Sequence, residues 1–358
     1  MKIIHITNEL SKKNISISSF VFYLSKNISS YFSDKYEIFT SSSNYNFKYS
    51  KKVYLFKKVN FIFFFLKLFS YIKRDEVKLV HIHGFWSLLT ICSLFLNILN
   101  KKKTIIHPHG MFHPKAISQS NFLKSNLKKI IIYLTRLVIS NNRNIFFVCI
   151  TKEELEHTNI LFPKTKKFKI NNPYPFQFNQ NKRKINLKKQ FIFLGRMNPY
   201  KNIDIIIKAF IKAKLPKEWL LKIYAIDDNI DYKIKIKNLI KNYNNIKLCN
   251  PIFDTQKNRV LQSSWANIVF SNSEVLSFSI MDSIFSSLPV IVSDNIDFEI
   301  DKKLVLKCKH DICSLTKKIR HLSQWSLKKR YKEGKKLSHN INLEKYNKNI
   351  NKKYINVL

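Results

Sequence analysis

Short apolar runs alternate with longer helical patterns along most of this 358-residue chain. We predict strands near 2–6, 36–39, 52–55, 78–82, 104–107 and 145–150, and helices near 16–31, 61–73, 86–99, 121–140 and 152–160. The alternation restarts with strands near 190–195, 220–225, 246–249, 267–270 and 289–293, and helices near 201–213, 231–243, 255–264, 278–286 and 311–322. Such alternation is typical of βαβ units on parallel sheets, so the predicted fold class is α/β.

A polar segment separates the two series. The stretch "NNPYPFQFNQNKRKINLKKQ", 171–190, holds two prolines and no apolar period, so we interpret it as a linker. The chain is also longer than one ordinary hydrophobic core supports. We therefore predict a first domain over 1–178, a second over 179–325, and a basic helical stretch over 326–358 that packs back on the first domain or stays partly loose.

The chain is strongly basic, with 64 Lys and Arg against 23 Asp and Glu and a formal net charge of +41. This charge would attract nucleic acid, anionic lipid or phosphorylated ligands. Only eight of the 64 are Arg, however, and a Lys-dominated, Phe-rich composition is what A+T-rich codons produce. Recognition of nucleic-acid bases relies on the bidentate guanidinium of Arg, so we expect no nucleic-acid partner. An anionic membrane surface remains a candidate partner.

Cysteines and apolar runs indicate a cytoplasmic location. The cysteines are Cys92, Cys149, Cys249, Cys308 and Cys313. They form no CxxC pair, and four lie in apolar stretches, which indicates reduced core residues. "MKIIHIT" has the pattern of a buried strand rather than a signal peptide. The longest apolar runs, 61–69 and 86–99, are shorter than the about 18 residues of a membrane span.

Glycine is scarce, with 4 in 358 residues against an average of about 7%. The four should mark positions that other residues cannot fill. Gly84, Gly110 and Gly195 each follow a predicted strand, whereas Gly334 lies elsewhere. Parallel sheets bind ligands at this edge, where glycine permits positive φ and a close backbone approach. The placement predicts a cleft between two domains; the alternative is three simple strand-to-helix turns.

The segment "GRMNPYK" places two cations at a predicted strand end. Arg196 leaves the strand, and Lys201 begins an amphipathic helix over 201–213. A helix N-terminus favours anions, and a guanidinium and an ammonium five positions apart would clamp a diphosphate. The alternative is two solvated surface cations in a basic chain.

Two carboxylates follow in "SNSEVLSFSIMD". Glu274 lies at a strand-to-helix turn, and Asp282 lies about one turn into the next helix, so both can face the same strand-end cleft. In a chain with few acids, solubility explains them poorly. The alternative is a favourable charge at a helix N-terminus and one surface Asp.

Together these segments resemble the retaining glycosyltransferases of family 4, whose GT-B architecture has two Rossmann-like domains facing across a cleft. The resemblance covers about 78–294. "GRMNPYK" is similar to the family's G-R-x4-K motif, and "EVLSFSIMD" is similar to E-x7-E with Asp282 as the second acid. "PHGMFHPKA" resembles the His-Gly segment of the acceptor domain, and "NNPYP" takes the place of an N-G-(V/I)-D turn.

The resemblance implies a nucleotide-diphosphate sugar as co-substrate, without cofactor or metal. Implied donor-binding residues are Gly195, Arg196, Lys201, Ser277, Phe278 and Asp282; implied catalytic residues are His109 and Glu274; implied acceptor-side residues are His83, Gly84 and Gly110. Arg196 and Lys201 would neutralise the departing diphosphate and Asp282 would hold the ribose, while Glu274 and the amides of 276–279 would hold the sugar and His109 would orient it. The acceptor would be a saccharide or lipid-linked molecule in surface polysaccharide or lipopolysaccharide synthesis, at the inner face of the cytoplasmic membrane.

The chain departs from the family at glycines. The loop "NELSKKNIS" has none, Ser277 and Ser287 stand where the family has glycines, and Ala225 or Ile226 stands at a strand end where one is expected. A serine that needs positive φ would cost about 1 kcal/mol and could narrow the donor pocket. Reduced or lost activity is one reading of this pattern.

Two other functions remain open. A metal hydrolase would use the histidines His81, His83, His107, His109 and His113, because His-x-His on a strand puts both rings on one face. No acid follows either histidine group within ten residues, and His81 and His107 also suit a core or turn role. A basic protein without catalysis would bind nucleic acid or lipid in a salt-sensitive way that ignores Glu274. We interpret "DDNID", 227–231, as a polar loop without metal.

Overall fold

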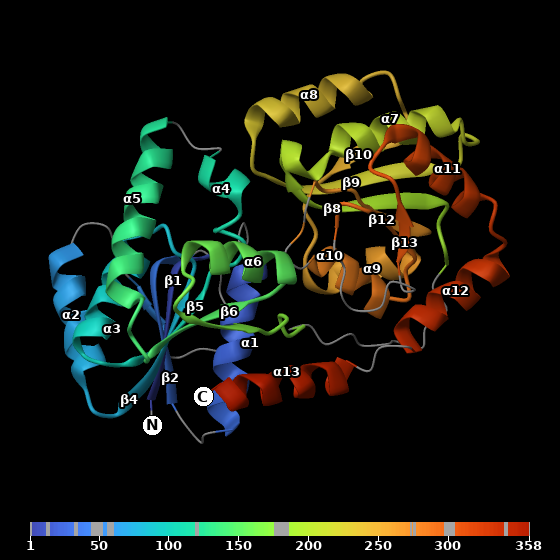
Figure 1. The fold of residues 1–358 in the computed structure, drawn as a ribbon. Helices are drawn as coiled ribbons and strands as arrows, with labels where there is room; N and C mark the ends of the chain where they lie inside the picture. The colour runs from blue at the N-terminus through green and yellow to red at the C-terminus, as the bar shows by residue number, and fades with distance from the viewer. Residues whose placement is uncertain are drawn as a thin grey trace. The chain divides into compact units, whose positions relative to one another are not determined.

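The computed structural model describes residues 2–11, 15–31, 35–43, 53–55, 61–118, 122–174, 186–272, 274, 277–296, 305–339 and 343–357. The chain divides into two compact units, the first holding Met1–Pro175 with Lys345–Leu358 and the second holding Phe176–Glu344. Each unit contains one parallel sheet flanked by helices (Figure 1). The predicted α/β class with two parallel sheets is confirmed.

The first unit has a seven-stranded sheet in the order β3-β2-β1-β4-β5-β6-β7, with every neighbouring pair parallel. The strands are β1 (Lys2–Leu10), β2 (Lys35–Ser43), β3 (Val53–Leu55), β4 (Val77–His83), β5 (Lys103–His107), β6 (Ile145–Cys149) and β7 (Lys166–Lys169). The helices are α1 (Ile15–Tyr31), α2 (Phe61–Lys73), α3 (Leu88–Leu99), α4 (Pro114–Ser118), α5 (Phe122–Ile139), α6 (Lys152–Leu161) and α13 (Leu343–Val357).

The two faces of this sheet have separate cores because successive strand residues point to opposite sides. Ile4 and Val80 pack with α2, α3 and α5 on one face. Ile3 and Leu79 pack with α1 and α13 on the other face, where Tyr354 of α13 is fully buried. The end of the chain is therefore part of the first unit's core.

The second unit has a six-stranded parallel sheet in the order β10-β9-β8-β11-β12-β13. The strands are β8 (Gln190–Met197), β9 (Leu220–Asp227), β10 (Ile246–Cys249), β11 (Ala266–Val269), β12 (Val290–Ser293) and β13 (Leu306–Cys308). The helices are the 3-10 helix η2 (Pro199–Lys201), α7 (Ile203–Ala213), α8 (Ile230–Ile240), α9 (Asp254–Ser263), α10 (Phe278–Phe285), α11 (Ile312–Ser323) and α12 (Leu327–His339). Its main core joins the sheet to α7, α8 and α11.

Helix α12 belongs to the second unit, unlike α13. A side chain at Gly334 would overlap the carbonyl oxygen of Ser287, so glycine lets α12 approach the end of α10 closely. The buried guanidinium of Arg330 donates to the carbonyls of Trp265, Ser264 and Ser287 at 2.6, 3.0 and 3.0 Å. The basic stretch 326–358 is thus divided between the two units.

Two expectations from the sequence are wrong in part, and two strands were missed. Residues 172–174 of the predicted linker are buried, because Tyr174 packs on the first unit and exchanges main-chain hydrogen bonds with the Asn347 side chain of α13. Cys313 is exposed on α11, and only Cys149 and Cys308 are buried. Edge strands β7 and β13 were not predicted. In the part of the chain that the structure describes, no helix is long and apolar enough to cross a membrane.

Candidate active site

Both sheets have the same strand order, in which the first strand of the unit lies beside the fourth. The crossovers reverse direction at this point, and ligands of such sheets bind beyond the carboxyl ends of these two strands. In the first unit the strands are β1 and β4, which ends at His83. In the second they are β8, which carries Arg196, and β11, which precedes Glu274.

Arg196 is the penultimate residue of β8 and is aligned with Ile226 of β9. Its Nη1 lies 3.7 Å from Oδ2 of Asp228, and the Arg196 side chain is 48% exposed. Asn198 Nδ2 donates to the same Asp228 oxygen at 2.8 Å. The "DDNID" loop therefore supplies an anionic partner that orients Arg196, a role that the sequence did not suggest.

Lys201 lies on η2, not at the start of α7 as predicted. Asn198 caps η2, and Asn202 then takes a φ of 51° before α7 begins. The Lys201 ammonium forms an ion pair with Oε1 of Glu274, to which Ser271 Oγ also donates at 2.5 Å. Both charged side chains are mostly buried. The structure thus brings together the predicted cation and the predicted acid.

Helix α10 presents its N-terminus near the end of β11. Ser277 is the N-cap and has an ordinary φ of −80°, but its side chain caps no N–H group. The first N–H groups of a helix lack intrahelical acceptors, and the helix dipole there favours an anion. The predicted amide of residue 276 lies outside the described residues. Phe278 begins the helix, so its N–H is one of these donors.

Asp282 lies one turn into α10 and is buried. Its Oδ2 is 2.9 Å from Nζ of Lys257, which is also mostly buried. Sequence reasoning missed Lys257, because nothing in the sequence places α9 beside α10. The predicted residues Arg196, Lys201, Glu274 and Asp282 are thus all in cation–carboxylate pairs, so an anionic ligand would replace existing ion pairs rather than meet isolated charges.

His310 was also missed. Its ring stacks on Phe270 with centroids 4.7 Å apart, and its Nδ1 lies 2.6 Å from Oγ of Ser293. Nε2 of His310 lies 3.1 Å from Nδ2 of Asn202. These contacts join the segments that end or follow β8, β11, β12 and β13. A lone histidine in sequence gives no signal of such a network.

Five histidines stack on the face of the first sheet that α1 and α13 cover: His5, His81, His83, His107 and His109. Strand register places His5 beside His81 and His83 beside His107. Ring nitrogens meet at 3.1 Å between His5 and His83, at 2.9 Å between His81 and His107, and at 3.4 Å between His83 and His109.

Burial lowers the pKa of all five rings, and those of His81 and His109 fall to about 3. The rings are therefore neutral near pH 7. The core role expected for His81 and His107 is confirmed, since both are buried. His83, predicted on the acceptor side, is buried too, because the stack encloses it, so it can act only through His109.

The loop after β5 turns sharply at His109 and Gly110, which have φ of 52° and 79°. The turn directs the Gly110 N–H to Oε1 of Glu154 at 2.5 Å, and Oε2 accepts the Ile150 N–H at 2.6 Å. Burial raises the pKa of the Glu154 carboxyl to about 7. Glu154 was missed, although Thr151-x-x-Glu154 has the spacing of a capping box.

Gly84 and Gly195 differ in backbone conformation and in their position relative to the strand. Gly84 has a φ of 86°, and a side chain there would meet Met111, which holds the loops after β4 and β5 together. Gly195 does not follow its strand as predicted. It lies inside β8, because pairing with β9 continues to Met197. Positive φ is confirmed for Gly84 and Gly110 only.

Comparisons with known proteins agree with this geometry. Residues 176–336 match the family model described as Glycosyl transferases group 1. The comparison with curated protein sequences found no match.

Several solved structures have the same fold. HepE of Anabaena, solved with UDP and glucose, has a TM-score of 0.75 at 13% identity, covering 100% of both chains. Sucrose-phosphate synthase from Thermosynechococcus elongatus has a TM-score of 0.68 at 14% identity, covering 100% of this chain and 99% of that one. WaaG, described as a glycosyltransferase involved in lipopolysaccharide biosynthesis, has a TM-score of 0.69 at 11% identity, covering 94% of each. The sequence match to the group 1 glycosyltransferases covers residues 176–336, and along its whole length the chain has the GT-B fold of these solved structures.

Proposed function

We propose that this chain is a retaining, metal-independent hexosyltransferase. It would transfer a sugar from a nucleotide-diphosphate sugar to a saccharide or lipid-linked acceptor, in the synthesis of a surface polysaccharide or lipopolysaccharide. The observation that carries the proposal is the set of charges at the carboxyl edge of the second sheet. There Arg196, Lys201, Glu274 and Asp282 lie on the segments that follow or end β8 and β11.

Arg196 and Lys201 are the residues proposed to receive the diphosphate. When the bond between the anomeric carbon and the diphosphate oxygen breaks, negative charge grows on the leaving group. Fixed cations stabilise that charge without reorganising. Lys201 is already held by Glu274, and Arg196 by Asp228, so both start close to a working position. The amides at the start of α10, including that of Phe278, would add dipoles of the same sign.

Glu274 and Asp282 are proposed to hold the hydroxyl groups of the donor. Phosphate binding at Lys201 would release one Glu274 oxygen to accept from the transferred sugar. Asp282 would bind the ribose, with Lys257 holding the carboxylate in place. The role of His109 in orienting the sugar, and those of Gly84 and Gly110 toward the acceptor, rest on the family resemblance. The neutral His109 ring suits hydrogen bonding to a sugar hydroxyl better than charge neutralisation.

The relatives suggest where to begin with ligands. HepE is solved with UDP-glucose, and WaaG is described as acting in lipopolysaccharide biosynthesis. UDP is therefore the first nucleotide to test here. We propose that the protein acts at the inner face of the cytoplasmic membrane. The exposed surface of α5 supports this location. Eight large apolar side chains of α5 are exposed, namely Phe122, Leu123, Leu127, Ile130, Tyr133, Leu134, Leu137 and Val138.

The first prediction concerns nucleotide binding at matched ionic strength, with chelator present. UDP, GDP, ADP and CMP are compared by thermal unfolding. One nucleoside diphosphate is expected to stabilise the protein, by about 2.7 kcal/mol at a hundred times its Kd. Arg196→Ala should weaken that nucleotide about tenfold or more, because a charge-assisted hydrogen bond contributes about 1.5–3 kcal/mol.

Arg259→Ala is the matched control, because Arg259 is an exposed arginine of the same unit on α9. It should leave nucleotide binding unchanged. Equal, weak stabilisation by all four nucleotides that persists in Arg196→Ala would instead indicate a non-catalytic basic binder. Turnover is tested directly by measuring the UDP that is released when the donor is hydrolysed in the absence of acceptor.

A further inference from the structure

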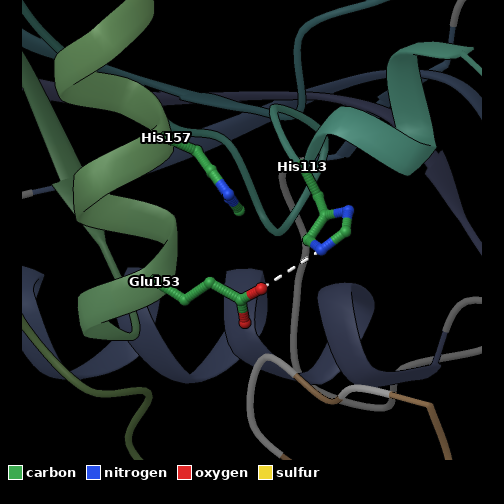
Figure 2. Close-up of side chains that lie close together, drawn as sticks. All are labelled: His113, Glu153 and His157. Carbon is green, nitrogen blue, oxygen red and sulfur yellow. Dashed lines mark ion pairs between the residues drawn. The ribbon is translucent and has the colours of Figure 1, made fainter.

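Three potential metal ligands meet on the surface of the first unit. They are His113, which follows the His109–Gly110 turn, and Glu153 and His157 of α6 (Figure 2). Their ligand atoms all lie within 4.8 Å of one another. No other group of three such side chains meets this criterion among the residues that the structure describes.

The local fold explains why these side chains meet. Glu153 and His157 are four positions apart on α6, so they project from the same face of the helix. The loop that carries His113 is held to the same helix, since Gly110 donates to Glu154. Nε2 of His113 lies 3.1 Å from Oε1 of Glu153, and the rings of His113 and His157 stand edge to face at 5.0 Å.

The charge around the group favours a cation despite the basic chain. Glu153 places a carboxylate beside the two imidazoles. Glu154 is buried against main-chain N–H groups, whereas Glu153 is exposed on the side of the histidines. Two imidazoles and one carboxylate form the donor set of many zinc sites, which keep a fourth position for water.

Binding requires only side-chain motion. Zn–N and Zn–O bonds of about 2.0–2.2 Å in a tetrahedron bring ligand atoms to about 3.4 Å apart. The His113 nitrogen and the Glu153 oxygen are already 3.1 Å apart. The His157 side chain would have to change its rotamer. Its ring is half-buried at the surface, so it is not held in place by the core.

We propose that His113, Glu153 and His157 bind a divalent transition-metal ion of the zinc class. The metal would fasten the loop that carries His109 and Gly110 to the first turns of α6. It shares only His113 with the histidine set considered from sequence. It would act on loop stability, separately from the nucleotide edge of the second unit, so its test does not depend on transfer activity.

The test uses full-length protein stripped with chelator, titrated with Zn²⁺ by calorimetry and with Co²⁺ by visible spectroscopy. Wild type should bind one equivalent, give tetrahedral Co²⁺ bands and gain thermal stability. Glu153→Gln and His157→Gln should each weaken Zn²⁺ by more than about tenfold, the least that even an altered outer-shell partner costs. Matched controls are Glu156→Gln on the same helix and His321→Gln, an exposed histidine of α11.

Two results would overturn the proposal. One is a wild-type protein that binds no Zn²⁺. The other is Zn²⁺ binding of equal strength in Glu153→Gln, His157→Gln and the two controls, which would place the ion on other side chains. Circular dichroism of each stripped variant establishes that the fold is intact, so a weaker affinity is then a ligand effect. Nucleotide stabilisation in chelator remains a separate measurement of the proposed transferase function.

Discussion

At the scale of single residues, glycine scarcity has left other side chains in left-handed backbone. Among the described residues, the non-glycine positions with positive φ are Lys101, His109, Asn202, Lys214 and Ser287. The strain expected at Ser287 is confirmed by its φ of 56°, whereas Ser277 is unstrained at −80°. Sequence alone could not separate these two serines, because φ depends on where α10 begins and ends.

Lys214 is a position at which the free-energy cost of a non-glycine residue in left-handed backbone can be measured. It is the exposed C-cap of α7, with a φ of 50°. Left-handed backbone costs an L-residue about 1–2 kcal/mol, and glycine loses about 0.5–1 kcal/mol more entropy on folding. Lys214→Gly should therefore raise the free energy of unfolding by about 0.5–1 kcal/mol, measured by urea denaturation.

Lys208→Gly is the control for this prediction. Lys208 is an exposed lysine inside α7, where glycine lacks any conformational advantage. Its substitution should lower stability by about 1 kcal/mol. Destabilisation of similar size by both substitutions would show that the position of Lys214 carries no strain.

At the scale of elements, β1, β4 and β5 carry neutral histidines into the first unit's core. An unfolded histidine binds a proton below about pH 6.5, but burial holds these five in the neutral form to much lower pH. The unfolded state then binds more protons, so stability falls as pH falls below about 6.5. Glu154 acts oppositely between about pH 4.5 and 7, because its raised pKa gives the folded state the extra proton.

The first unit should consequently be acid-labile. As the pH falls, each histidine can lower the free energy of unfolding by up to about 1.4 kcal/mol per pH unit. Glu154 offsets the contribution of one histidine. Four uncompensated groups would remove about 5 kcal/mol per pH unit, which is comparable with the whole stability of an ordinary domain. Denaturant titrations followed by circular dichroism at pH 7.5, 6.5 and 5.5 should show this loss. His5→Gln should reduce the slope by about 1.4 kcal/mol per pH unit, the contribution of one proton.

The elements also show what sequence could and could not predict. Strong apolar periods located most helices and central strands, whereas the edge strands "KKFK" and "LKC" have no such period. Arg196 and Glu274 were predicted at one edge because β8 and β11 end there. Asp228, the partner of Arg196, and Lys257, the partner of Asp282, were not predicted, because lateral neighbours depend on how strands and helices are ordered. The Glu154 contact likewise joins residues 44 positions apart in the sequence.

At the scale of the whole molecule, the net charge of +41 acts together with the exposed face of α5. Helix α5 buries Ile132, Thr135 and Ile139, and a stripe that includes Leu127 and Leu134 lies on its opposite side. Long-range charge draws a protein toward anionic lipid, and inserted apolar side chains then hold it there. The net charge and the family resemblance were the basis of the sequence prediction; α5 adds a specific part of the surface.

The last prediction tests that combination with vesicles. Wild type should bind anionic vesicles at low salt, bind neutral vesicles less, and be released as salt rises. Leu127→Gln with Leu134→Gln should weaken partitioning about thirtyfold, because inserting two half-exposed leucines contributes about 2 kcal/mol. Ile230→Gln with Ile234→Gln, on exposed positions of α8 in the second unit, is the matched control and should not change binding. Equal binding of both double variants would leave charge as the only attraction, and absence of binding to anionic vesicles at low salt would remove membrane association from the proposed function.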